Sequence, residues 1–218
     1  MATALEPTQP LVGGPPPFEP VTPQFGGGGD DSGKPDRKHS SVTSVVGVVV
    51  LMCASIMTFG AMFFAMIARR AMADDWHHLP LPRILWWNTG ILILSSIAID
   101  IGRRVLRRNR RAAFNILWSA GTVMGTWFLI GQIIAWTQLE SKGFYLKGNP
   151  SSAFFFVLTW AHAAHVVGAL AAVYYVEYRG LRYELGPSRR SWVDASALFW
   201  HFLDVLWLGI MGLFVFWA

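Results

Sequence analysis

Five long apolar segments dominate this sequence and constrain its fold. They run from about Val42 to Ala68, Ile84 to Ile101, Phe114 to Thr137, Ser152 to Tyr178, and Val193 to Trp217. Each holds roughly the twenty apolar residues with which a helix crosses about 30 Å of hydrocarbon. A chain in lipid must satisfy its own backbone groups, and the alternation typical of strands is absent. We therefore predict an all-α fold, an integral membrane bundle of five transmembrane helices.

The composition supports a membrane protein over a soluble one. Of the 218 residues, 53% are hydrophobic and 14% are charged, whereas a soluble domain carries about 25% charged residues. The net charge of +5 could indicate a nucleic-acid partner. The arginine clusters instead flank the apolar segments, where basic residues set membrane topology, so we predict no nucleic-acid binding.

The basic residues divide unevenly between the two sides that five crossings define. Thirteen fall on one side: Lys34, Arg37, Lys38, Arg103, Arg104, Arg107, Arg108, Arg110, Arg111, Arg179, Arg182, Arg189 and Arg190. Five fall on the other: Arg69, Arg70, Arg83, Lys142 and Lys147. Because basic residues stay on the inner side of a membrane, we predict a cytoplasmic N-terminus and an external C-terminus. An even number of helices would remove this asymmetry.

Residues 1–40 differ in composition from the remainder, residues 41–218. They contain GGPPPFEP and FGGGGDDSG, which hold too little apolar surface to fold. We predict a disordered or extended cytoplasmic tail followed by a five-helix transmembrane domain.

The single cysteine, Cys53, lies within the first apolar segment. One cysteine cannot form an internal disulfide. It also excludes the usual iron–sulfur ligand sets, a C-x-x-C-H haem attachment site and a two-cysteine copper site. We interpret Cys53 as a small packing residue.

Ionisable side chains inside membrane spans are costly, so they are candidates for function. This chain has six: Asp100, His162, His165, Glu177, His201 and Asp204. Asp100 precedes Arg103 and Arg104 by three and four residues, which predicts ion pairs on the helix surface. Glu177 lies near the end of its segment, where it can reach the interface.

The three histidines and Asp204 lie deeper. His165 and Asp204 each lie about 20 Å from the cytoplasmic ends of adjacent antiparallel segments, at 1.5 Å per residue. We hypothesise that Asp204 hydrogen-bonds His201 or His165. Contact with lipid or with a partner is a second interpretation. A third is haem ligation by His162 together with His201 or His165.

Other polar and aromatic residues predict contacts between helices. Asn88 and Gln132 are candidates for interhelical hydrogen bonds, worth about 0.6 kcal/mol each. Tryptophans near the segment ends, including Trp86, Trp87, Trp118 and Trp192, predict belts at the two interfaces. Trp127, Trp160, Trp200 and Trp207 lie deeper, where they should pack between helices or against a partner.

The last two segments resemble subunit III of haem-copper (cytochrome c) oxidases. The last reads FWHFLDVLWLGIMGLFVFW and is similar to the family's C-terminal signature, here Trp200, His201, Phe202, Asp204 and Trp207. The fourth reads FVLTWAHAAHVVGALAAVYY, which resembles a Gly-x-His-x-x-His-Val pattern with Trp160 or Ala161 in place of the glycine. The stretch DWHHLPLPRILWWNTGILILSS looks like the short bacterial members of the family. The resemblance covers about residues 42–218.

The resemblance implies a membrane subunit of a proton-pumping oxygen reductase in aerobic electron transport. Such a subunit lies beside the catalytic subunit I and subunit II in the bacterial inner membrane, stabilises the complex and its phospholipids, and supports proton uptake. It has no catalytic or metal-binding residues, and the haem and copper belong to the partner subunits. A larger respiratory supercomplex is also compatible with the resemblance.

Two departures separate this chain from typical family members. Those members have seven helices, and this chain lacks the first two. The membrane-buried Glu that follows a Ser in the family is replaced here by Ile56, after Ser55. The proton-collecting role of that carboxylate therefore does not carry over.

Two other classes of function compete with this interpretation. The chain could be an accessory or anchor subunit of another respiratory complex, such as a quinol oxidase or a nitric-oxide reductase. It could also be a small transporter, but transporters generally show internal repeats or broken helices, and neither is evident in this sequence.

Overall fold

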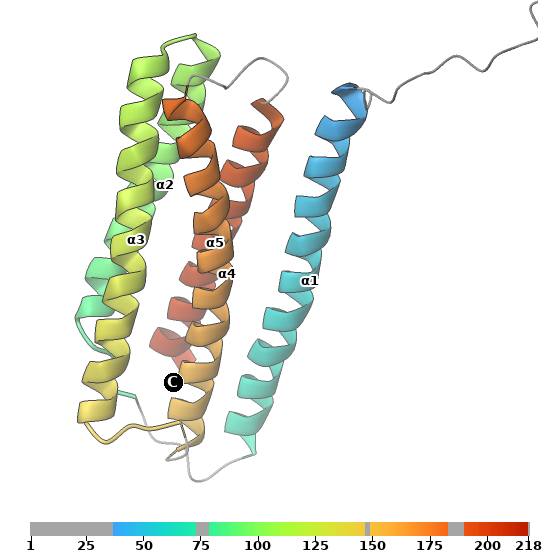
Figure 1. Ribbon diagram of the computed structural model, residues 1–218. Helices are drawn as coiled ribbons and strands as arrows, with labels where there is room; N and C mark the ends of the chain where they lie inside the picture. Colours follow the sequence, from blue (N-terminus) through green and yellow to red (C-terminus); the bar gives the residue numbers. More distant parts are fainter. Residues whose placement is uncertain (1–36, 73–78, 147–148, 183–189, 218) are drawn as a thin grey trace, which may run out of the picture. The chain divides into compact units, whose positions relative to one another are not determined.

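The computed structural model describes residues 37–72, 79–146, 149–182 and 190–217. These residues form five helices: α1 (Arg37–Ala71), α2 (Ile84–Arg107), α3 (Arg111–Ser141), α4 (Pro150–Leu181) and α5 (Arg190–Trp217). All five are long and apolar enough to span a bilayer, which confirms the predicted all-α membrane fold. Successive helices run antiparallel, so α1 begins at one end of the bundle and α5 finishes at the other (Figure 1).

The helices are longer than the apolar segments that predicted them. Helix α2 continues past Ile101 to Arg107, and two arginines occupy its last turn, where they complement the negative end of the helix dipole. Helix α1 begins at Arg37, within the stretch that the sequence assigned to the tail. Residues 1–36 of that tail lie outside the described residues. Hydropathy therefore identified each span but underestimated its polar ends.

Helix α1 lies at the edge of the bundle. Helices α2, α3, α4 and α5 contact one another in turn, and α5 also contacts α2, whereas α1 packs mainly on α5 and slightly on α4. Of the most apolar stretch of each helix, only 11% is buried in α1, compared with 50% in α4. Met57 and Phe64 are 76% and 74% exposed, so this side of α1 faces lipid or another chain.

The tryptophans divide differently from the predicted pattern. Trp86 and Trp87 are exposed near the start of α2, as an interfacial belt requires. The prediction for Trp118 is wrong, because its side chain is fully buried and its Nε1 donates a hydrogen bond of 3.0 Å to the Val173 carbonyl. The sequence position of Trp118 did not show that its side chain faces α4.

Helices α2 and α3 form the most extensive helix pair in the bundle, and polar contacts hold them at close range. Asn88 Nδ2 donates to the Phe128 carbonyl at 3.1 Å, and Ser95 Oγ donates to the Gly121 carbonyl at 2.8 Å. The Asn88 amide lies directly against Gly131, leaving no space for a Cβ atom. Gly131 therefore permits the hydrogen bond that joins the two helices.

Gly131→Ala should destabilise the bundle by about 1–3 kcal/mol, because the added methyl group displaces the Asn88 amide from its acceptor. Thermal denaturation in detergent, followed by size-exclusion chromatography with fluorescence detection, measures the change. Gly90→Ala is the matched control, since a Cβ at Gly90 meets nothing within 4 Å. Equal melting temperatures for the two variants would contradict the proposed close contact.

Candidate functional site

The C-terminal motif residues divide between two faces of α5. Trp200 and Trp207 are seven residues apart, nearly two helical turns, and are 1% and 0% exposed. His201 and Asp204 are one turn apart on the side facing α2. The motif therefore contributes both to the core of the bundle and to its surface.

Trp207 joins α5 to two other helices. Its Nε1 donates a hydrogen bond of 3.0 Å to Thr89 Oγ1 on α2. Its ring packs at 85° against Phe128 of α3, with centroids 5.2 Å apart. The indole combines a large apolar body with one satisfied donor, which suits a residue packed between membrane helices.

The Trp200 ring packs directly against Gly125 of α3. A Cβ atom on Gly125 would overlap the outer edge of the Trp200 ring and would also meet Leu170 of α4. Gly121, one turn earlier, instead faces Ser95 and Ile99 of α2. The two glycines of this GxxxG spacing on α3 therefore pack against different helices: Gly121 against α2, and Gly125 against α5 and α4.

His162 is fully buried in the centre of the bundle. Its ring lies 5.1 Å from the Trp207 ring and 6.0 Å from the Phe128 ring, centroid to centroid. Neither ring nitrogen has a hydrogen-bond partner among the described residues. In the described part of the chain, His162 therefore packs among aromatic rings.

The two amides predicted to join helices behave differently. Asn88 makes its interhelical bond to Phe128, whereas both polar atoms of the buried Gln132 side chain lack a hydrogen-bond partner among the described residues. The interhelical bond predicted for Gln132 is therefore absent from this part of the chain.

His165 points toward α1. Its Nδ1 lies 2.7 Å from the Ala161 carbonyl of its own helix, and its ring packs edge-on against Phe59 with centroids 5.4 Å apart. Asp204 lies on the opposite side of α5, facing α2. Of the two hypothesised partners of Asp204, the structure thus places His201 beside it and separates His165 from it.

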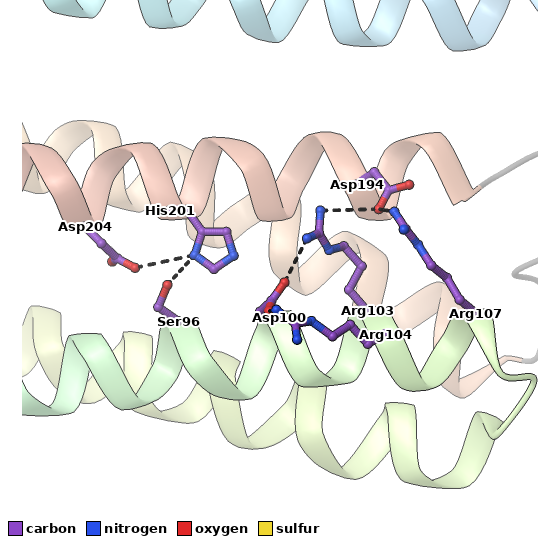
Figure 2. Close-up of polar contacts among 8 residues, drawn as sticks. All are labelled: Ser96, Asp100, Arg103, Arg104, Arg107, Asp194, His201 and Asp204. Atoms are coloured by element: carbon purple, nitrogen blue, oxygen red, sulfur yellow. Dashed lines mark hydrogen bonds and ion pairs between the residues drawn. The ribbon is translucent and has the colours of Figure 1, made fainter.

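Ser96, His201 and Asp204 form what we call the α2–α5 polar cluster (Figure 2). Ser96 Oγ contacts His201 Nδ1 across the helix pair. The same Nδ1 lies 4.0 Å from Asp204 Oδ2. Neither oxygen of Asp204 has a hydrogen bond of ordinary length among the described residues, so this carboxyl group is incompletely satisfied.

A charged network closes the end of the α2–α5 pair at which α5 begins (Figure 2). Asp100 pairs with Arg103 at 2.8 Å and with Arg104 at 2.5 Å, which confirms the predicted ion pairs. Asp194 of α5 lies 3.1 Å from Arg107 and 3.6 Å from Arg103. These contacts fix the register of α5 against α2, although exposed pairs of this kind contribute at most about 1 kcal/mol each.

Sequence reasoning missed three members of these networks. Ser96 is a small hydroxyl residue within an apolar run, Thr89 is one of several threonines within the spans, and Asp194 lies near the start of α5, just after its first turn. One signal was available for Asp194. An isolated carboxylate faces the basic end of α2 across an antiparallel pair, which predicts the bridge to Arg107.

Glu177 is also tied to a neighbouring helix. Ser119 Oγ donates a hydrogen bond of 2.6 Å to Glu177 Oε1, which links α3 to α4. This carboxylate therefore helps to join helices, in addition to lying near the end of its span.

The intramembrane histidines face three different environments: the bundle core for His162, α1 for His165 and α2 for His201. In the part of the chain that the structure describes, no three His, Cys, Asp or Glu side chains gather in a group that could hold a metal ion. The arrangement suits helix packing and hydrogen bonding.

Comparison with known proteins identifies the family. The profile of cytochrome c oxidase subunit III matches residues 40–218. The chain is 30% identical over 174 residues to cytochrome c oxidase subunit 3 of Corynebacterium diphtheriae, covering 76% of this chain and 83% of the relative. It is 32% identical over 171 residues to cytochrome c oxidase subunit 3 of a Synechocystis species, covering 74% of this chain and 70% of the relative.

A third relative is the probable cytochrome c oxidase subunit 3 of Mycobacterium tuberculosis, 27% identical over 177 residues, with 78% of this chain and 86% of the relative covered. The match spans all five helices and agrees with the motif on α5. The chain therefore belongs to the cytochrome c oxidase subunit III family, and it is a multi-pass membrane protein and a non-catalytic subunit of a multi-subunit haem-copper oxidase.

Proposed function

We propose that this chain packs beside the catalytic subunit I and subunit II of a proton-pumping oxygen reductase, stabilises them and their lipids, and supports proton uptake. The observation that carries the proposal is the family match over residues 40–218. In this proposal the haem and copper lie in the partner subunits, and no residue of this chain takes part in the redox chemistry.

The use of the intramembrane polar residues supports a structural role for this subunit. Trp207 bonds to Thr89, Asn88 bonds to the backbone of α3, and Ser119 bonds to Glu177. Each bond joins two helices and occupies a group that would otherwise be costly in lipid. The histidines that could ligate a haem face different neighbours, which favours packing roles for them.

Lipid binding is part of the proposal, and an apolar groove supports it. Helices α1, α4 and α5 line a cavity of about 540 Å³. Small residues, including Gly47, Ala164, Gly168 and Ala195, leave this space open. A phospholipid acyl chain has the chemistry that such a lining accepts.

The location we propose is the cytoplasmic membrane of a bacterium, with the N-terminus inside and the C-terminus outside. The bacterial relatives and the excess of basic residues at the ends where α2 finishes and α5 begins support this orientation. The Asp100–Arg103 and Asp194–Arg107 pairs would then lie at the cytoplasmic side.

Affinity purification tests the proposed assembly. A tag on the N-terminal tail, used in a mild detergent, should recover stoichiometric haem-copper oxidase chains, and the preparation should show haem bands in the reduced-minus-oxidised spectrum and contain copper. The control is the same tag on an unrelated five-helix membrane protein. Recovery of this chain with no oxidase chain would overturn the proposal, and haem without copper would indicate a nitric-oxide reductase instead.

Reporter fusions test the orientation. We expect a C-terminal alkaline phosphatase fusion to be active, because that enzyme folds outside the cytoplasm. A phosphatase inserted after Arg108, between α2 and α3, should be inactive. The reciprocal fluorescent-protein fusions serve as controls and should report the opposite activities. Phosphatase activity at the Arg108 site would reverse the proposed topology.

A further inference from the structure

A groove runs along the outer surface of α2 and α5. It has a volume of about 580 Å³ and passes between exposed aliphatic side chains, including Ile97 at 50% and Val205 at 68% exposure. The α2–α5 polar cluster lines its floor, and Asp100 and Arg104 line one end. The groove is therefore apolar along its edges and polar at its base.

Asp204 is the unusual group in this groove. Its side chain is only 10% exposed, and neither of its oxygens has a hydrogen bond of ordinary length among the described residues. At 1.5 Å per residue, it lies about 20 Å from the start of α5, inside the hydrocarbon region. Carboxyl groups at such depth pair with another polar group. Ser96 and His201 are the polar side chains beside Asp204, but the one hydroxyl proton of Ser96 is shared with His201 and His201 lies 4.0 Å away. A carboxyl group can accept more hydrogen bonds than these two side chains supply.

We propose that the α2–α5 groove docks a transmembrane helix of a partner subunit in the oxidase complex, and that this helix presents a hydrogen-bond donor to Asp204. The proposal rests on the proposed function, because it requires a partner chain in the same membrane. It adds the surface through which the two subunits meet and the polar group that sets their depth relative to each other.

The chemistry of the groove favours a protein helix over a lipid. An acyl chain could cover Ile97 and Val205, but it carries no donor for Asp204. A lipid headgroup lies at the interface, where it could reach Arg104 and not a carboxyl group about 20 Å deep. A helix supplies both apolar side chains for the edges and a polar side chain at a fixed level.

The outer face of α3 provides the contrast within this chain. Its exposed side chains include Ile116, Val123, Trp127 and Ile133, which are apolar and suited to lipid. The single carboxylate of α3 is Glu140, one residue before the helix ends, so α3 contributes no carboxyl group to this face within the span. The two faces therefore form a matched pair for an experiment.

Site-directed crosslinking in the purified complex tests the docking surface. The Cys53→Ala variant removes the single cysteine, and one cysteine is then introduced at Ile97, Val205, Val123 or Ile133. Each variant is labelled with a benzophenone maleimide before membrane solubilisation, and the tagged complex is purified, irradiated and analysed by mass spectrometry. We expect Ile97→Cys and Val205→Cys to link to an identified oxidase chain, and Val123→Cys and Ile133→Cys to give only lipid or detergent adducts.

Three outcomes would overturn the docking surface. They are lipid adducts alone from both groove positions, links from the groove to a second copy of this chain, and links to an oxidase chain from the α3 positions alone. In each case the recovered oxidase chains would leave the proposed function intact. Wild-type chain purified without any oxidase chain would overturn the function and the docking surface together.

Substitution of Asp204 tests the hydrogen bond separately. Asp204→Leu should raise the rate at which the subunit dissociates from the complex by about tenfold, because the donor on the partner helix is left unpaired. Asp204→Asn keeps an acceptor of the same shape and should have a smaller effect. Glu140→Gln, at an exposed carboxylate near the end of α3, is the control and should not change dissociation.

Size-exclusion chromatography of the isolated variants separates this effect from misfolding. A wild-type elution profile with faster dissociation supports the bond, and a wild-type dissociation rate for Asp204→Leu refutes it. If Asp204→Leu does not fold, the Asp204→Asn rate and the crosslinks, which need no change at Asp204, still decide the proposal.

Discussion

The absence of water inside a bilayer is the constraint on which this structure depends. Apolar side chains gain little from packing against each other when lipid is the alternative, so close contacts and hydrogen bonds must hold the helices together. This chain meets the requirement with a few bonds around α2: Asn88 to α3, Ser95 to α3 and Thr89 to Trp207 of α5. Helix α2, the shortest of the five, thereby links its two neighbours.

The motif on α5 combines two roles in adjacent residues. Trp200 and Trp207 complete the core, and Trp207 carries its own donor to Thr89. His201 and Asp204 lie on the same helix, but their side chains line the groove between α2 and α5. One short sequence can therefore fix the internal packing of a subunit and also define a surface, since any change in the orientation of α5 would move both sets of residues together.

The sequence predicted the helical spans far better than the direction in which each side chain points. Hydropathy identified all five spans, and the local spacing of Asp100 with Arg103 and Arg104 predicted their ion pairs. The rotation of each helix was less accessible, because in a membrane the lipid-facing and core-facing residues are both apolar. Trp118 consequently proved to be buried, Gln132 proved to lack its expected bond, and His165 proved to face α1 instead of Asp204.

Helix α1 shows how the departure from the family pattern fits this reasoning. Ser55 is buried and bonds to the Leu51 carbonyl of its own helix at 2.8 Å, and Ile56, which the resemblance places at the position of the family's carboxylate, is 55% exposed. A glutamate at that position would project from an edge helix that has few contacts of its own, so it would need a neighbour to satisfy it. The apolar side chain of Ile56 avoids this cost.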